Sequence, residues 1–108
     1  MSTEQQRKMM ECAAKACGYE ILDWYGERYT AHDGEKLIAF NPLTNPGDTA
    51  EMCAKLALDT AWGVDDVIVM VPEEEAHRVS YEDHDNSRLK AWMYAATMVA
   101  AKIGGYTE

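Results

Sequence analysis

The sequence predicts an α+β fold: a four-stranded, mainly antiparallel sheet with helices on both faces, in the order α-β-β-α-β-β-α. Segments with helical spacing alternate with pairs of β-like segments, and each pair is joined by a short turn signal. Residues 67–71 are continuously apolar, which indicates a central strand covered on both faces. The chain has 108 residues, of which 47% are hydrophobic and 27% charged, so a single domain spanning 1–108 is expected.

Three helices are expected where apolar residues recur at intervals of three and four. The first ends at Gly18, and the last is capped by one of residues 85–87 and ends at Gly104. The second is capped by Asn45, has Pro46 at its first position and runs to about Thr60. The expected core faces are Met10, Ala13, Ala14 and Cys17 in the first helix, Ala50, Cys53, Ala54 and Ala57 in the second, and Leu89, Trp92, Met93, Ala96, Val99, Ala100 and Ile103 in the last.

Two hairpins are expected between these helices. The first has strands near 19–25 and 36–40 around the turn signal at residues 32–34. The second has strands at 67–71 and 77–82, with Val79 pointing inward. The tryptophans Trp24, Trp62 and Trp92 are expected in the core.

The charge of the chain restricts its partners. Nineteen acidic residues against ten basic ones give a net charge of −9, which repels nucleic acid and anionic membranes. The expected partner is a basic protein, such as one that normally binds nucleic acid. No apolar stretch reaches the roughly 20 residues of a membrane span, and residues 1–18 lack the apolar core of a signal peptide, so a cytoplasmic location is expected.

The acidic residues are concentrated between positions 65 and 85, where eight of them accompany a single basic residue, Arg78. A hairpin over this segment is expected to bring its acidic ends and its turn to one rim. This rim is interpreted as a docking surface for the basic partner; a solvated loop that only keeps the protein soluble remains the alternative. The predicted partner-binding residues are Asp65, Asp66, Glu73, Glu74, Glu75, Glu82, Asp83 and Asp85.

No catalytic residue, metal site or cofactor is expected. The three cysteines, at positions 12, 17 and 53, are odd in number and lack the CxxC spacing of a zinc site, so reduced thiols are expected. The carboxylates and imidazole of residues 83–85 resemble the start of a calcium loop, but Arg88 stands where such a loop needs glycine. Neither Ser80 nor Ser87 has the surroundings of a nucleophile elbow. The protein is therefore expected not to be an enzyme.

Aromatic residues gather around the first predicted hairpin. Tyr25 and Tyr29 are predicted to form an aromatic contact patch on it. The alternative is that these tyrosines are only the edge of the hairpin.

Residues 40–50 read FNPLTNPGDTA, an Asn-Pro turn followed by a capped helix. Together with the aromatic strand that begins at residues 18–21 and the alanine-rich helix 91–105, this step resembles the phage ABA-sandwich domain and the NinX-like accessory proteins of tailed phages. The resemblance implies a helix-sheet-helix sandwich and a bacteriophage or prophage origin. It implies no catalytic residue.

Charge and resemblance together predict a phage-encoded, anti-CRISPR-type protein. It is expected to bind and inhibit a host nucleic-acid-handling effector in the cytoplasm of the bacterial host, through its acidic surface. The alternative is a protein that sequesters a nucleotide signal in an aromatic pocket, between the subunits of a homodimer. That pocket requires basic residues such as Arg28, Lys36 or Arg88 to converge.

Overall fold

The computed structural model describes residues 3–25, 28–32, 34–71 and 75–107, apart from the side chains of residues 3, 21, 23–25, 28–29 and 75. In this part of the chain, helices and strands follow the order α-β-β-β-α-β-β-β-α, with a short 3₁₀ helix before the last element. They are α1 (Thr3–Ala16), β1 (Glu20–Tyr25), β2 (Arg28–His32), β3 (Leu37–Phe40), α2 (Pro46–Leu56), β4 (Asp59–Trp62), β5 (Asp66–Val71), β6 (Glu75–Ser80), η1 (Tyr81–His84) and α3 (Arg88–Ile103).

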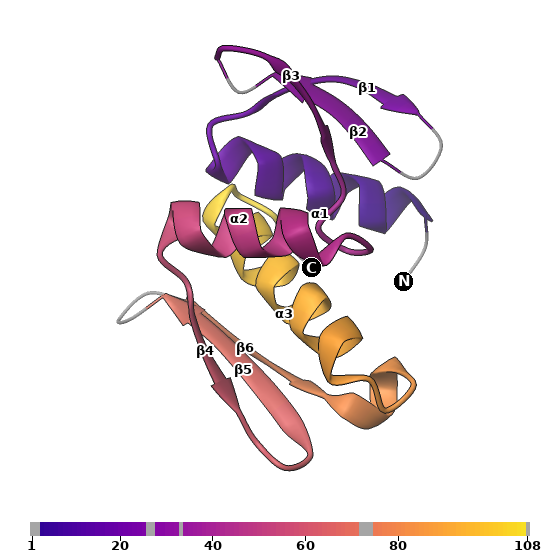
Figure 1. Ribbon diagram of the computed structural model, residues 1–108, viewed down its shortest axis with the longest axis vertical. Helices are drawn as coiled ribbons and strands as arrows, with labels where there is room; N and C mark the ends of the chain where they lie inside the picture. The colour runs from indigo at the N-terminus through magenta and orange to yellow at the C-terminus, as the bar shows by residue number, and fades with distance from the viewer. Residues whose placement is uncertain (1–2, 26–27, 33, 72–74, 108) are drawn as a thin grey trace.

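The strands form two separate antiparallel sheets rather than one. Sheet A has the order β1-β2-β3 and sheet B the order β4-β5-β6. The helices lie between the two sheets, with sheet A beside α1 and sheet B beside α3 (Figure 1). The predicted single four-stranded sheet with helices on both outer faces is therefore wrong: the layers are reversed, and each predicted hairpin gains a strand.

Strand β5 shows why the layer prediction failed. Val67 and Val69 are fully buried, whereas Ile68 and Met70, on the opposite face of the strand, are only half-buried. The buried face lies toward α3, and no helix of the described residues packs on the other one. A continuous apolar run therefore does not require a strand that is covered on both faces. Here the same kind of sequence forms a strand with one buried face and one partly exposed face.

The first hairpin prediction missed β2. The turn signal at 32–34 does separate two strands, but these are β2 and β3, and β1 pairs with β2 as an additional strand. Asp33, in the middle of the turn signal, lies outside the described residues. The register between β1 and β2 slips at Leu22, so that residue is an extra one in its strand, and its side chain is half exposed.

The start of α2 confirms the prediction. The side-chain oxygen Oδ1 of Asn45 accepts hydrogen bonds from the backbone N of Gly47 at 2.9 Å and of Asp48 at 3.2 Å, and Pro46 is the first helical residue. The Oδ2 atom of Asp48 accepts a hydrogen bond at 2.9 Å from the backbone N of Asn41, which ties the turn to the helix. The local sequence is sufficient here because each contact lies within seven residues.

The end and the face of α2 were predicted wrongly. The helix ends at Leu56, and residues 59–62 form β4. Thr49 and Met52 are the buried residues of α2, in place of the small residues expected at positions 50, 53, 54 and 57. Because α2 covers one side of a helical layer rather than a sheet, its buried face is narrower than expected.

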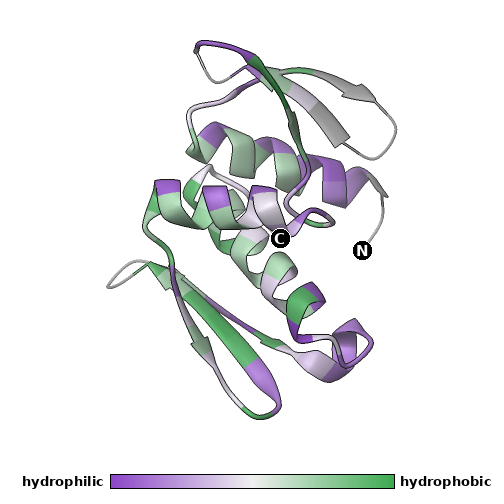
Figure 2. Ribbon diagram, in the orientation of Figure 1, coloured by the Kyte–Doolittle hydropathy of each residue, from purple (hydrophilic) through white to green (hydrophobic). Residues whose placement is uncertain are grey.

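Helix α3 lies at the centre of the molecule. Residues 95–101 are all buried, so this stretch is enclosed on every side. Figure 2 shows the helix mostly in the pale to green colours of weakly to strongly hydrophobic residues. Its alanines allow close packing on α1, whose predicted core residues are buried as expected. Ser87 is its N-cap, as one of the three residues predicted, and accepts a hydrogen bond from the backbone N of Lys90 at 3.1 Å. The predicted core positions Leu89 and Ile103 are exposed, because they lie near the ends of the helix.

Candidate functional site

The acidic residues of the 65–85 segment do not lie on one rim. In the β5–β6 register, Asp66 pairs with Ser80 at one end of the hairpin and Val71 pairs with Glu75 at the other. Six residues of strand span roughly 20 Å. The expected single rim is therefore wrong. Glu73 and Glu74 lie outside the described residues, as does the side chain of Glu75. The described acidic side chains of this segment lie at the opposite end of the hairpin, near Asp66 and Ser80.

That other end is called the η1 end. It consists of the β4–β5 turn, η1 and the first turn of α3, which adjoin one another at one tip of the molecule (Figure 1). Five of the predicted partner-binding residues lie there: Asp65, Asp66, Glu82, Asp83 and Asp85.

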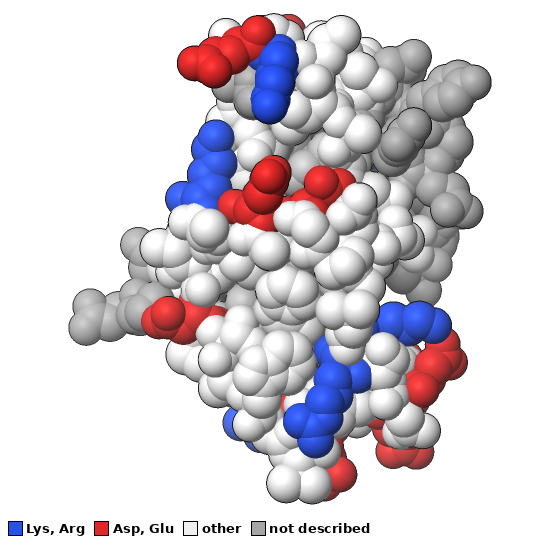
Figure 3. Space-filling view, viewed as in Figure 1, with Lys and Arg blue, Asp and Glu red and all other residues white. Residues whose placement is uncertain are grey.

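Basic side chains neutralise part of this charge. Arg78 Nη1 lies 3.4 Å from Asp66 Oδ2, and Lys90 Nζ lies 2.9 Å from Asp85 Oδ2. The guanidinium of Arg88 lies 5.1 Å from the centre of the Tyr81 ring. Figure 3 shows the resulting mixture, with acidic and basic side chains side by side at the lower end. Both ion pairs are solvent-exposed, so they contribute little stability. Among the carboxylates of the η1 end, Asp65, Glu82 and Asp83 form no ion pair with a described residue.

The ion pair between Lys90 and Asp85 also changes the pKa of the Asp85 carboxyl group. The hydrogen bond from Lys90, together with the positive charge of its ammonium group, lowers the pKa of Asp85 below its usual value.

Large apolar side chains are exposed at the same end. Trp62 is 51% exposed, Val64 84% and Leu89 48%. Trp62 was predicted to be in the core, but half of it is exposed, and the ring of Trp92 lies against it at a centroid distance of 6.3 Å. Trp92 is held in turn by a hydrogen bond of 3.2 Å from its Nε1 to Thr60 Oγ1. Exposed apolar groups next to carboxylates are typical of a protein-docking surface.

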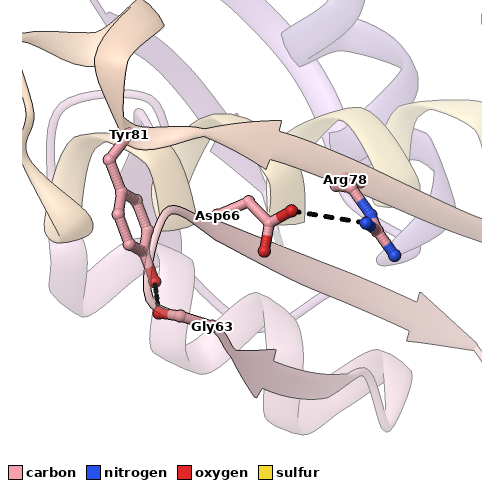
Figure 4. A network of polar contacts seen from close by, with 4 residues as sticks. All are labelled: Gly63, Asp66, Arg78 and Tyr81. Atoms are coloured by element: carbon pink, nitrogen blue, oxygen red, sulfur yellow. Dashed lines mark hydrogen bonds and ion pairs between the residues drawn. The ribbon is translucent and has the colours of Figure 1, made fainter.

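Tyr81 fixes the geometry of this end. Its hydroxyl donates a hydrogen bond of 2.9 Å to the carbonyl of Gly63 (Figure 4). Its backbone N donates one of 3.0 Å to the carbonyl of Asp65. The connection from η1 to α3 has two successive residues in the left-handed region, Asp85 with φ 57° and Asn86 with φ 56°. Aspartate and asparagine tolerate this conformation better than most residues, so the connection can turn sharply.

Two hollows flank η1. The first, of about 560 Å³, is lined by Val64, Asp65, Glu82 and Arg88 among others. The second, of about 440 Å³, lies along β6 and contains Asp83 together with the rings of His77, His84 and Tyr94. Consecutive acidic residues therefore line different hollows, Glu82 the first and Asp83 the second.

Other predicted site residues stand apart from this end. The side chains of Tyr25 and Tyr29, which were predicted to form an aromatic contact patch, lie outside the described residues. Lys36 precedes β3 on sheet A, whereas Arg88 begins α3 beside sheet B, so these two basic residues do not converge on one pocket (Figure 1). Within the described ranges, no group of three or more metal-ligating side chains gathers, and no helix is long and apolar enough to cross a membrane.

Sequence reasoning missed the apolar half of the η1 end. The available signal was Val64, an apolar residue between Gly63 and two aspartates in a turn, where a buried position is not expected. Trp62 was missed because an apolar period does not reveal which side of an edge strand remains open. A search of family models, of curated proteins and of solved structures found no match to this chain.

Proposed function

We propose that the protein acts by binding a basic protein through the η1 end. The observation that carries the proposal is that Trp62 and Val64, both more than half exposed, lie two residues apart, and that Val64 lines the same hollow as the carboxylates of Asp65 and Glu82. An interface needs an apolar anchor for affinity and complementary charge for orientation, and this end offers both.

Charge supports a basic partner rather than an acidic one. The net charge of −9 attracts a positively charged surface over a distance of several ångströms, and the unpaired carboxylates of the η1 end remain available for direct contact. Arg88 and Lys90 of this end, and Arg78 on the adjoining strand β6, each already face an acidic or aromatic side chain of the protein itself.

The most specific form of the proposal is inhibition of a host nucleic-acid-handling effector by a phage-encoded accessory protein. Its support is the net charge together with the sequence resemblance to small phage proteins. In this form, the η1 end occupies a surface of the effector that otherwise contacts phosphate groups.

The test compares variants in capture of basic proteins from bacterial lysate. In the double variant Asp65→Lys, Glu82→Lys, we expect the captured amount to fall at least about tenfold, because two carboxylates of the site become repulsive. Captured proteins should be released at high salt and by a short DNA duplex, since salt screens exposed charges and the duplex competes for the same basic surface.

Two matched controls separate this surface from net charge. Glu20→Lys, Glu51→Lys changes the net charge equally on β1 and α2, where both residues are exposed, and should leave capture unchanged. Val64→Asp should reduce capture, whereas Leu37→Asp, at a residue 63% exposed on sheet A, should not. Equal loss of capture in both double variants would show that only overall charge matters and would contradict the proposal.

A further inference from the structure

We infer that the free edge of β6 binds an extended, basic segment of the partner as an added strand of sheet B. The inference rests on the proposed function for the positive charge of the partner. It goes further by naming a second contact, its geometry and the backbone groups that make it.

The free edge follows from the hydrogen-bond pattern of sheet B. Strand β6 is the last strand of that sheet, and Tyr81 N donates to Asp65 O, which makes this pair a hydrogen-bonded one. In an antiparallel ladder such pairs alternate, so the backbone groups of His77 and Val79 also point toward β5. Those of Ala76, Arg78 and Ser80 therefore point away from the sheet, and no backbone hydrogen bond outside sheet B reaches them in the described chain.

This edge opens into the second hollow described above. Four successive residues of β6, from His77 to Ser80, line the hollow of about 440 Å³, and Gln6 of α1 lines it as well. A long free edge is a site for strand pairing unless the protein covers it, and here a hollow rather than packed chain adjoins the edge. The edge is therefore accessible to a segment in extended conformation.

The hollow suits a lysine or arginine side chain. In an added strand, the residues opposite His77 and Val79 point into the hollow, because directly opposite residues share a face. There the ring of Tyr94 lies 4.8 Å from that of His84 and 6.1 Å from that of His77, measured between centroids. Asp83 supplies a carboxylate in the same hollow. A basic side chain can lay its stem and charge against the rings and pair its end with this carboxylate.

A second copy of this chain suits the edge less well. Its net charge of −9 repels another copy. Symmetric antiparallel pairing of the whole edge would also centre on Arg78, so that two guanidinium groups would face each other across the joint. A basic segment of a different protein meets neither objection.

The probe for the test is a six-residue peptide of alternating lysine and valine with blocked ends, added to the full-length protein labelled with ¹⁵N. We expect the backbone amides of Ala76, Arg78 and Ser80 to gain protection from hydrogen exchange when the peptide binds, since only these point to the edge. Methylating the amides of the valines should weaken binding at least about tenfold, whereas methylating those of the lysines should not, because alternate amides face opposite sides.

Variants of the protein provide the second arm. Arg78→Pro removes one N–H group that points to the free edge, without removing a hydrogen bond to β5. The control is Arg78→Ala, which loses the same side chain but keeps the N–H group. We expect Arg78→Pro to bind the peptide about fivefold more weakly than Arg78→Ala. Asp83→Lys should weaken binding, and Glu82→Lys, which changes the adjacent residue in the other hollow, should have a smaller effect.

The outcomes distinguish this inference from the proposed function. Equal binding of both methylated peptides, or of an alternating glutamate and valine peptide, overturns strand addition. Protection of the three amides that rises with protein concentration alone, together with a doubled mass, shows a second copy at the edge and also overturns it. If Asp65→Lys, Glu82→Lys abolishes capture of basic proteins while Arg78→Pro leaves it intact, the η1 end is the binding surface and only the edge inference fails.

Discussion

Ala57 ends α2 with backbone angles that suit glycine. Its φ of 55° and ψ of 46° lie in the left-handed region. The backbone N of the next residue, Leu58, donates a hydrogen bond of 2.9 Å to the carbonyl oxygen of Cys53, which closes the helix. A side chain with a Cβ atom costs about 1 kcal/mol in this conformation. Ala57→Gly should therefore raise the free energy of unfolding by up to about 1 kcal/mol, measured by urea denaturation.

The control for Ala57→Gly is the same change three residues earlier. Ala54 is exposed and lies inside α2, so Ala54→Gly should lower the free energy of unfolding by about 1 kcal/mol. A loss of stability in both variants would contradict the left-handed cap.

Two thiols couple stability to high pH. Burial raises the pKa of Cys17 to about 11, an increase that the charge of Lys55 opposes and the neighbouring Cys53 supports to a smaller extent. Burial also raises the pKa of Cys53 to about 11. The folded state therefore keeps both protons at pH values where the unfolded chain loses them. Their contribution is complete below pH 9 and is lost as the pH rises toward 11.

We expect the free energy of unfolding to fall between pH 8 and about pH 10.5, by about 1 kcal/mol per thiol, because solvent partly screens both groups. The variant Cys17→Ala, Cys53→Ala should show a smaller fall over the same range, even if it is less stable at pH 8. Urea denaturation at the two pH values measures both falls. An identical fall in the variant would mean that other groups cause the pH dependence.

At the scale of elements, the contact between α1 and α3 depends on one glycine. A Cβ atom added at Gly104 would overlap the carbonyl oxygen of Cys12 and lie 2.7 Å from its carbonyl carbon. Both are backbone atoms of α1, so no side chain can move aside, and the ends of the helices must separate. Gly104→Ala should therefore lower the free energy of unfolding by roughly 2–3 kcal/mol, measured by urea denaturation.

The adjacent glycine separates packing from backbone strain. Gly105 has a φ of 98°, which disfavours alanine, but no atom lies within 4 Å of an added Cβ. Gly105→Ala should cost only the strain of about 1 kcal/mol. If Gly105→Ala were the more damaging change, the close approach of α3 to Cys12 would not limit stability.

The two ends of α2 show which part of an element a sequence can predict. Its start is fixed by Asn45, Pro46 and Asp48, whose contacts are local and whose residue types are characteristic of a helix start. Its end is at Ala57, a residue type that normally continues a helix, so tertiary packing rather than local preference stops it there.

The prediction of a single acidic rim was wrong for a different reason, the length of the hairpin. Counting charges along residues 65–85 ignores the length of the strands, and the β5–β6 register places Asp66 and Glu75 at opposite ends of the hairpin. Arg78 and Lys90 then pair with acidic residues that are 12 and 5 positions away, which a local charge count does not reveal. The apolar half of the candidate site could be recognised only once the exposed side of β4 was known.

At the scale of the molecule, the number of elements was easier to predict than their layers. The three helices were expected near their observed positions, but two sheets outside a helical layer and one sheet inside two helical layers bury similar amounts of apolar surface. The burial of α3 from 95 to 101 on all sides distinguishes them, since a helix on the outside of a sheet would leave one face in water.

This arrangement predicts that the two sheets unfold together. Met9 on α1 is fully buried in the same core cluster as Val67 and Val69 of sheet B, because α3 lies between them and contacts both. Met9→Ala should therefore lower the free energy of unfolding by about 2–4 kcal/mol and shift the urea transitions of fluorescence and far-ultraviolet circular dichroism equally. If Trp24 on β1 is replaced by phenylalanine in both proteins, the tryptophan fluorescence comes from Trp62 on sheet B and Trp92 on α3, so it reports from the side opposite the substitution. A circular-dichroism transition that moved while the fluorescence transition stayed in place would show that sheet B with α3 unfolds independently of α1.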